Sequence, residues 1–214
     1  MMQTDDLIRA LAGNVAPVSP HLVERQLAMG IAAGAVATLL AIASTLGFRP
    51  DLAAAMHDFT FWMKWTYTIS LGVGAIAATV HLARPDATRA QWLWLLVIPF
   101  GLLACVAASE LARTPFDGWL PLWLGQSWKR CSIFVAMLAA PIFIGLIWAF
   151  RQFAPTRLRL TGATAGLASG ACAATLYGLH CPEASALFVL TWYSLGMGLA
   201  ALAGTLIGPR FLRW

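Results

Sequence analysis

One short segment of the chain combines three side chains that could take part in thiol or metal chemistry. His180-Cys181-Pro182-Glu183 contains an imidazole, a thiol and a carboxylate within four residues. These groups are a plausible ligand set for a soft metal ion, and His57 from a distant segment could add a further ligand. The segment therefore indicates either metal binding or thiol redox chemistry, and it does not identify the metal.

A second cysteine lies directly after two basic residues. Cys131 follows Lys129 and Arg130, and local positive charge favours the reactive thiolate form. The spacing does not decide whether Cys131 and Cys181 meet. Three interpretations therefore stay open: a redox- or metal-sensing pair, a structural disulfide, or two unrelated thiols.

The motifs of common enzymes are missing from the sequence. It contains no Cys-x-x-Cys, no His-Glu-x-x-His, no phosphate-binding loop and no recognisable Ser-His-Asp arrangement. We therefore expect a protein that is not an enzyme and has no resident cofactor. A heavy-metal ion bound transiently at the cysteines is the one exception that we consider.

The amino-acid composition indicates whether the protein folds in water or in a lipid bilayer. Of 214 residues, 60% are hydrophobic and 11% are charged, whereas a soluble domain has about 25% charged residues. A water-soluble core of this size buries only about 70% of the surface of its chain. The sequence therefore predicts an all-α, polytopic membrane protein.

Each crossing of a bilayer by a helix needs about 20 mostly apolar residues. Six stretches meet this requirement, so we expect a six-helix transmembrane domain over residues 27–207. The six stretches are Leu27–Gly47, Trp62–Ala83, Trp92–Ser109, Cys131–Phe150, Thr161–His180 and Leu187–Ile207.

The basic residues of the connections predict the orientation. Nine of the 14 Lys and Arg residues fall on the side that holds both termini. The positive-inside rule then predicts that residues 1–26 and 208–214 lie in the cytoplasm. Cys131 and Cys181 fall at the outer rim, whereas Cys105 and Cys172 fall inside spans. Because the net charge of +5 reflects topology, we expect no direct contact with nucleic acid.

One predicted span has an unusual face of small residues. Gly162, Gly166, Gly170, Ala174 and Gly178 recur at every fourth position. Such a face allows another helix to approach closely. It could serve a homo-oligomer or a sliding surface, but we favour a tightly packed central helix within one chain.

Charged residues are scarce at mid-depth in the predicted spans. Lys64, His81 and Glu110 lie near span ends, where snorkelling to the interface explains them. A transporter usually places ionisable residues deeper, so a transport function is disfavoured. In the connection over residues 111–130, prolines and glycines predict short turns or a helix in the interface plane.

The N-terminal segment is predicted to form a short amphipathic helix. Thr4 can cap it, Asp5 and Asp6 suit its positive end, and Leu7, Ile8 and Leu11 form an apolar face. A helix of about three turns is too short to be stable alone in water. It must rest on the bilayer, on the bundle or on a partner protein.

These features together resemble the negative-regulator-of-sigma-F family, a group of six-span anti-sigma factors of the proteobacterial inner membrane. The resemblance covers essentially the whole chain. It is carried by three stretches, which are Thr4-Asp5-Asp6-Leu7-Ile8-x-x-Leu11, Gly125-Gln126-Ser127-Trp128-Lys129-Arg130-Cys131, and the segment that begins with His180-Cys181-Pro182-Glu183 and runs through Phe188 and Trp192-Tyr193 to Gly196-Met197.

The resemblance implies a concrete function. The protein would hold an extracytoplasmic-function sigma factor inactive at the membrane. Oxidants or heavy metals would act on Cys131 and Cys181 and release that factor, with His180, Glu183 and His57 as candidate metal or supporting residues. The N-terminal residues would contact the sigma factor; these are Asp5, Asp6, Leu7, Ile8 and Leu11. The alternatives are a small membrane transporter and a thiol-redox membrane protein.

Overall fold

The computed structural model describes residues 22–82, 94–151 and 157–213, together with the single positions 4 and 13. All regular elements in this part of the chain are helices, which confirms the all-α class. The predicted N-terminal helix, with Asp5, Asp6, Leu7, Ile8 and Leu11, lies outside the described residues.

The described helices form six long segments joined by short ones. In chain order they are α2 (Leu22–Ala41), the π-helix η1 (Ile42–Leu46), α3 (Leu52–Ala55), α4 (Phe59–Leu82), α5 (Trp94–Arg113), α6 (Phe116–Leu124), α7 (Trp128–Phe150), α8 (Leu158–Tyr177), α9 (Ala186–Phe188), the π-helix η3 (Val189–Tyr193) and α10 (Ser194–Phe211).

Each of the six predicted spans overlaps one long helical segment. By length and apolar composition, four segments of the described chain could cross a membrane: Glu24–Leu46, Leu96–Arg113, Phe116–Phe150 and Ala186–Phe211. The helices α4 and α8 are outside this set, and both are rich in Gly, Ala and Thr. That these two helices also cross the membrane remains a prediction.

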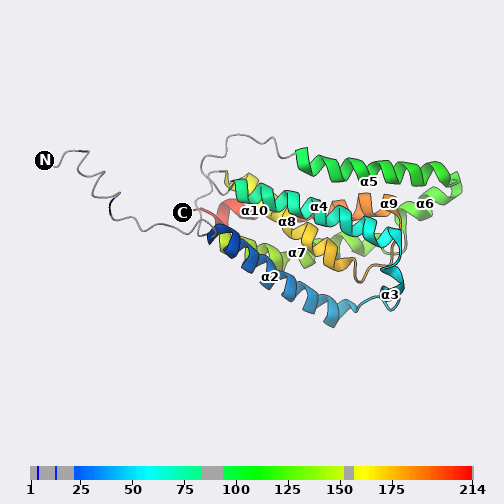
Figure 1. The fold of residues 1–214 in the computed structure, drawn as a ribbon, viewed down its shortest axis with the longest axis horizontal. Coiled ribbons are helices and arrows are strands. Elements are labelled where there is room, and N and C mark those ends of the chain that lie inside the picture. Colours follow the sequence, from blue (N-terminus) through cyan, green and yellow to red (C-terminus); the bar gives the residue numbers. More distant parts are fainter. Residues whose placement is uncertain (1–3, 5–12, 14–21, 83–93, 152–156, 214) are drawn as a thin grey trace.

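The long helices lie side by side in one elongated bundle (Figure 1). α8 lies against α4, α7 and α10, while α2 packs on α7 and α5 lies at the edge beside α4. One end of the bundle carries α3, α6 and α9. The start of α2 and the end of α10 lie together at the opposite end.

The small residues of α8 serve contacts within the chain. A Cβ atom added at Gly162 or Gly166 would collide with backbone carbonyls of α10, at Gly204 and Ala200 respectively. The two backbones therefore approach until almost no space remains between them. This confirms the interpretation of α8 as a tightly packed central helix.

The contact between α2 and α7 follows the same rule. Gly30 faces Gly145, and a Cβ atom on either residue would collide with the carbonyl group of the other. Farther along the contact, the Thr38 hydroxyl donates a hydrogen bond to the Leu138 carbonyl at 2.9 Å. Close backbone packing and a polar contact together fix α2 on the bundle.

The connection predicted over residues 111–130 contains the nine-residue helix α6. None of its residues is buried, and the exposed side chains include Phe116, Trp119, Leu120 and Trp123. Amphipathic indoles prefer the headgroup level of a bilayer, so the composition of α6 suits a helix in the interface plane.

The helix contact between α8 and α10 predicts that Gly204 cannot accept a larger residue. Gly204→Val should destabilise the purified protein by about 1–3 kcal/mol or more, because the added carbons must force two backbones apart. The measurement is the temperature at which the detergent-solubilised protein loses its monodisperse elution peak.

The matched control is Gly198→Val on the same helix, where nothing lies within 4 Å of an added Cβ atom. Equal melting temperatures for the two variants would contradict the proposed tight contact.

Candidate functional site

The structure brings Cys131 and Cys181 together at the end of the bundle that carries α6 and α9. Cys131 lies in the first turn of α7, and Cys181 lies in the turn that follows α8. Both side chains are 0% exposed, and their sulfur atoms are within hydrogen-bonding reach of each other. Both are free thiols.

The carboxylate of Glu183 joins the two cysteine segments. Its Oε1 atom accepts hydrogen bonds from the backbone N–H groups of Gln126 and Ser127, at 2.7 and 3.0 Å. It also accepts one from the Ser127 hydroxyl at 3.1 Å. These donors precede α7, where the helix dipole favours a negative charge. Glu183 thus anchors the turn that contains Cys181 to the start of the helix that contains Cys131.

Gly125 makes room for this anchor. Its φ angle is +54°, a left-handed conformation that favours glycine. A Cβ atom at this position would lie 2.5 Å from Glu183 Oε2. The two sequence stretches that contain the cysteines are therefore in direct contact.

Lys64 is a part of the site that the sequence analysis missed. We expected its ammonium group to snorkel to the interface, but its side chain is only 2% exposed. Its Nζ atom donates hydrogen bonds to the carbonyls of Glu183, at 2.6 Å, and Cys181, at 3.2 Å. The bonds hold the turn on both sides of Pro182. Position alone could not reveal this, because the partners lie more than a hundred residues away in the sequence.

The positive charge beside Cys131 was expected from Lys129 and Arg130, but it comes from Lys64. Lys129 and Arg130 are exposed, and the Lys129 ammonium group lies 5.5 Å from the centre of the Trp128 ring. Lys64, in contrast, acts electrostatically on both cysteines. The cation that acts on the cysteine pair is therefore the buried Lys64 of α4.

Tyr193 completes the surroundings of Cys181. It ends the π-helix η3, and its side chain is fully buried beside the ring of Tyr177. Its hydroxyl group lies near enough to Cys181 to lower the pKa of the thiol. The hydroxyl is not aligned for a hydrogen bond with any described side chain or backbone atom. π-Helical turns often occur at functional sites, and this one directs a hydroxyl group at the cysteine pair.

These contacts make the two thiols unequal. Hydrogen bonding from Cys131 lowers the pKa of Cys181 most, and burial opposes it by raising the pKa. The Tyr193 hydroxyl, the charge of Lys64 and the backbone of Glu183 each lower it further, to about 6. The pair can therefore hold one thiolate and one thiol at neutral pH. Such a pair can form a disulfide or bind a soft ion.

The other predicted ligands have different partners. The Nδ1 atom of His180 lies 2.8 Å from the Gly47 carbonyl oxygen, the Glu183 carboxylate anchors α7, and His57 is exposed. Within the described part of the chain, no group of three or more His, Cys, Asp or Glu residues is arranged to hold a metal ion. Cys105 is exposed on α5, and Cys172 is partly buried in α8.

Glu110 also has a structural role that the sequence did not reveal. Its Oε2 atom accepts hydrogen bonds from the Ser185 hydroxyl at 3.1 Å and from the Leu187 N–H group at 3.2 Å. It thereby holds the start of α9 against α5. The segment after Cys181 is thus held by α4, α5 and α7 together.

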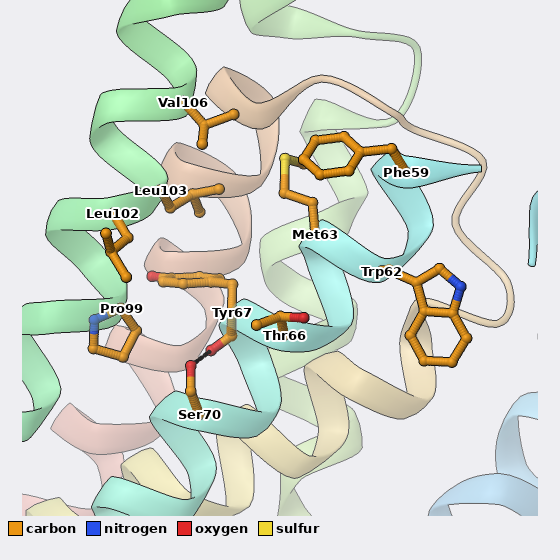
Figure 2. A pocket seen from close by; sticks show the side chains of 10 residues that line it. All are labelled: Phe59, Trp62, Met63, Thr66, Tyr67, Ser70, Pro99, Leu102, Leu103 and Val106. Atoms are coloured by element: carbon orange, nitrogen blue, oxygen red, sulfur yellow. Dashed lines mark hydrogen bonds between the residues drawn. The ribbon is translucent and has the colours of Figure 1, made fainter. Parts of the chain in front are cut away.

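A side cleft of about 260 Å³ lies between α4 and α5 (Figure 2). Its walls are mainly apolar, with Met63, Leu103 and Val106 among them, and Tyr67 lies between the two helices. The Tyr67 hydroxyl is hydrogen-bonded to Ser194 at 2.6 Å. Neither cysteine lines this cleft, so the cleft is separate from the cysteine pair.

Comparisons with known proteins identify relatives along the whole chain. The family model described as negative regulator of sigma F matches residues 11–214. The chain is 40% identical over 215 residues to the anti-sigma-F factor NrsF of Caulobacter vibrioides, and 37% identical over 215 residues to the probable anti-sigma-F factor NrsF of Azospira oryzae. Each alignment covers 100% of both proteins. No solved structure matches the chain.

The Glu183 anchor predicts a loss of stability when its carboxylate is removed. Glu183→Ala should lower the free energy of unfolding by about 1–3 kcal/mol, because three donors near the start of α7 lose their acceptor. Thermal denaturation in detergent measures this. The control is Asp117→Ala on the exposed surface of α6, and equal losses in the two variants would refute the anchor.

The cysteine pair also predicts a pH dependence. The pKa of Cys181 is about 6 in the folded protein and 9.0 as a free thiol. Because it is lowered on folding, ionisation contributes stability above the unfolded pKa, and this contribution is lost as the pH falls through about 6. Ultraviolet absorbance of the thiolate should therefore rise with a midpoint near pH 6. A wild-type curve equal to that of Cys181→Ser would contradict this.

Proposed function

The chain belongs to the negative-regulator-of-sigma-F family, and from this premise we propose that it restrains an extracytoplasmic-function sigma factor and releases it when Cys131 and Cys181 react. The protein is an anti-sigma factor, a regulatory protein rather than an enzyme, and its partner is a sigma factor. Family membership favours this function over a transporter or a thiol-redox membrane protein.

The proposal places the protein in the bacterial inner membrane, with six spans and both termini in the cytoplasm. Four segments are long and apolar enough to cross, and α4 and α8 are helices of similar length in the same bundle. The positive-inside rule supports the orientation, because arginines gather where α7 and α10 end and α8 begins. These are Arg151, Arg157, Arg159, Arg210 and Arg213.

The observation that carries the sensing proposal is the buried contact between the two cysteines. An oxidant that accepts two electrons would join their sulfur atoms as a disulfide, and the protons of the thiols would be released. A heavy-metal ion would instead bind the two thiolates directly and displace their protons. His180 and Glu183 have other partners, which favours a site made of two sulfur atoms.

Either reaction would be transmitted along two helices. Cys131 lies at the start of α7 and Cys181 follows the end of α8, so both helices run from the cysteine pair to the opposite end of the bundle. In the proposed topology this is a distance of about 30 Å across the hydrocarbon core. Residues 1–26 would contact the sigma factor there, through Asp5, Asp6, Leu7, Ile8 and Leu11.

Sensing by the pair predicts that each cysteine is required for release. Cys131→Ser and Cys181→Ser should still bind the sigma factor but should retain it after an oxidant or heavy-metal challenge. The measurement is the amount of sigma factor that co-purifies with the tagged protein before and after the challenge. Cys105→Ser and Cys172→Ser are matched controls, since these residues lie outside the pair. Normal release from both pair variants would exclude the sensing proposal.

A further inference from the structure

We infer that Cys181 is the thiol that reacts first with an oxidant, that Cys131 then resolves the product into a disulfide, and that Lys64 is the positioning residue of the reactive turn. The inference deepens the proposed sensing function and rests on it. It assigns separate roles to two cysteines and adds a residue from α4 to the site.

The inference that Cys181 reacts first is argued from the different surroundings of the two sulfur atoms. The Lys64 ammonium group donates a hydrogen bond to the Cys181 carbonyl at 3.2 Å, so a buried cation lies against this cysteine. The Cys131 thiol, the Tyr193 hydroxyl and the backbone of Glu183 also favour its thiolate, because each lowers the pKa of Cys181. The Ser127 hydroxyl lies 3.9 Å from its sulfur atom. The Cys131 thiol acts as the donor toward Cys181, which places the charge of the pair on the Cys181 sulfur. Negative charge is therefore held on Cys181, and the thiolate is the nucleophile in thiol chemistry.

The inference that Lys64 positions the reactive turn is argued from its contacts. This cation is 2% exposed, and its two hydrogen bonds hold the carbonyls on either side of Pro182. The carboxylate of Glu183 is occupied at the start of α7, and the ion pair in the described part of the chain joins Arg49 to Asp51 instead. Cys181 is therefore the strongest charge partner of Lys64. Lys64 is thus a buried cation whose described hydrogen-bond partners are carbonyl groups, and a nearby positive charge favours a thiolate.

The reaction with a hydroperoxide illustrates the separate roles of the two cysteines. The Cys181 thiolate attacks one peroxide oxygen, the O–O bond breaks, and the departing alkoxide takes a proton from water to leave as an alcohol. Cys181 is oxidised to a sulfenic acid. The Cys131 thiol then loses its proton and attacks the Cys181 sulfur, the S–O bond breaks, and water leaves. In sum, two thiols and one hydroperoxide give a disulfide, an alcohol and water.

The location of Cys181 allows small oxidants to approach. The residue lies in the turn between α8 and α9, and its neighbours Pro182 and Ala184 are exposed. Local opening of this surface turn would expose the sulfur to a small oxidant. Cys131 lies in the first turn of α7.

The order of reaction is tested on the purified full-length protein in detergent. Cys131→Ser and Cys181→Ser are treated with hydrogen peroxide in the presence of dimedone, which traps sulfenic acids, and the modified residue is identified by mass spectrometry. We expect Cys181 in the first variant to be trapped at least about tenfold faster than Cys131 in the second. Equal rates, or faster trapping of Cys131, would overturn the assignment.

The role of Lys64 is tested in the Cys131→Ser background through the pH profile of trapping. Lys64→Met should raise the pH of half-maximal rate by about one unit and slow trapping near neutral pH by about 3–10-fold. Lys129→Met is the matched control, because this exposed lysine is nearer to the cysteines in sequence but lies over Trp128. An unchanged profile in Lys64→Met, or an equal shift in Lys129→Met, would refute the role.

A second variant keeps the test valid if Lys64→Met does not fold. Tyr193→Phe removes one hydroxyl group beside Cys181 and should shift the profile in the same direction by a smaller amount. An unshifted profile in this variant would refute the stabilised thiolate. These readouts need no sigma factor, so trapping at Cys181 without sigma release would contradict the proposed function and leave the inference intact.

Discussion

The contact on which the site depends is the one between the Glu183 carboxylate and the residues that open α7. Residues 125–127 belong to the connection between α6 and α7, whereas Glu183 belongs to the turn after α8. Charge-assisted hydrogen bonds are stronger than neutral ones, and the half-buried Glu183 carboxylate makes two of them with the backbone N–H donors of Gln126 and Ser127. Satisfying them places the turn of Cys181 against the first turn of α7, and the two cysteines meet as a consequence.

Close backbone packing holds the helices that carry the site, α7 and α8, against their neighbours. α8 lies directly on α10 because Gly162 and Gly166 have no side chains at their contact, and α2 approaches α7 in the same way at Gly30. Protein interiors packed at this density switch between discrete arrangements and do not deform continuously. A bundle of this kind would suit the proposed sensing function, in which a bond formed at one end alters a contact at the other.

The charged groups inside the bundle, the Lys64 ammonium group and the Cys181 thiolate, lie close to each other. Burying a lone ammonium group or a lone thiolate is expensive, but Lys64 lies beside the Cys181 turn and its protons are shared with two carbonyls. Oxidation of the pair would remove the negative charge and leave the lysine without its counter-ion. Such a change would weaken the hold on the turn, which offers a physical route from thiol chemistry to helix movement.

The sequence by itself determined the all-α class, the approximate position of the long helices, the small-residue face of α8 and the two cysteine segments. Local composition suffices for these, because lipid requires long apolar helices and close packing requires missing side chains. Only the tertiary structure decided that Cys131 and Cys181 touch, that Glu183 is an anchor, and that Lys64 is buried beside them. Lys64 and Glu183 are 119 residues apart in sequence, and only the packing of α4 against α8 brings them together. Local patterns cannot encode such a pairing, since it depends on which helices become neighbours.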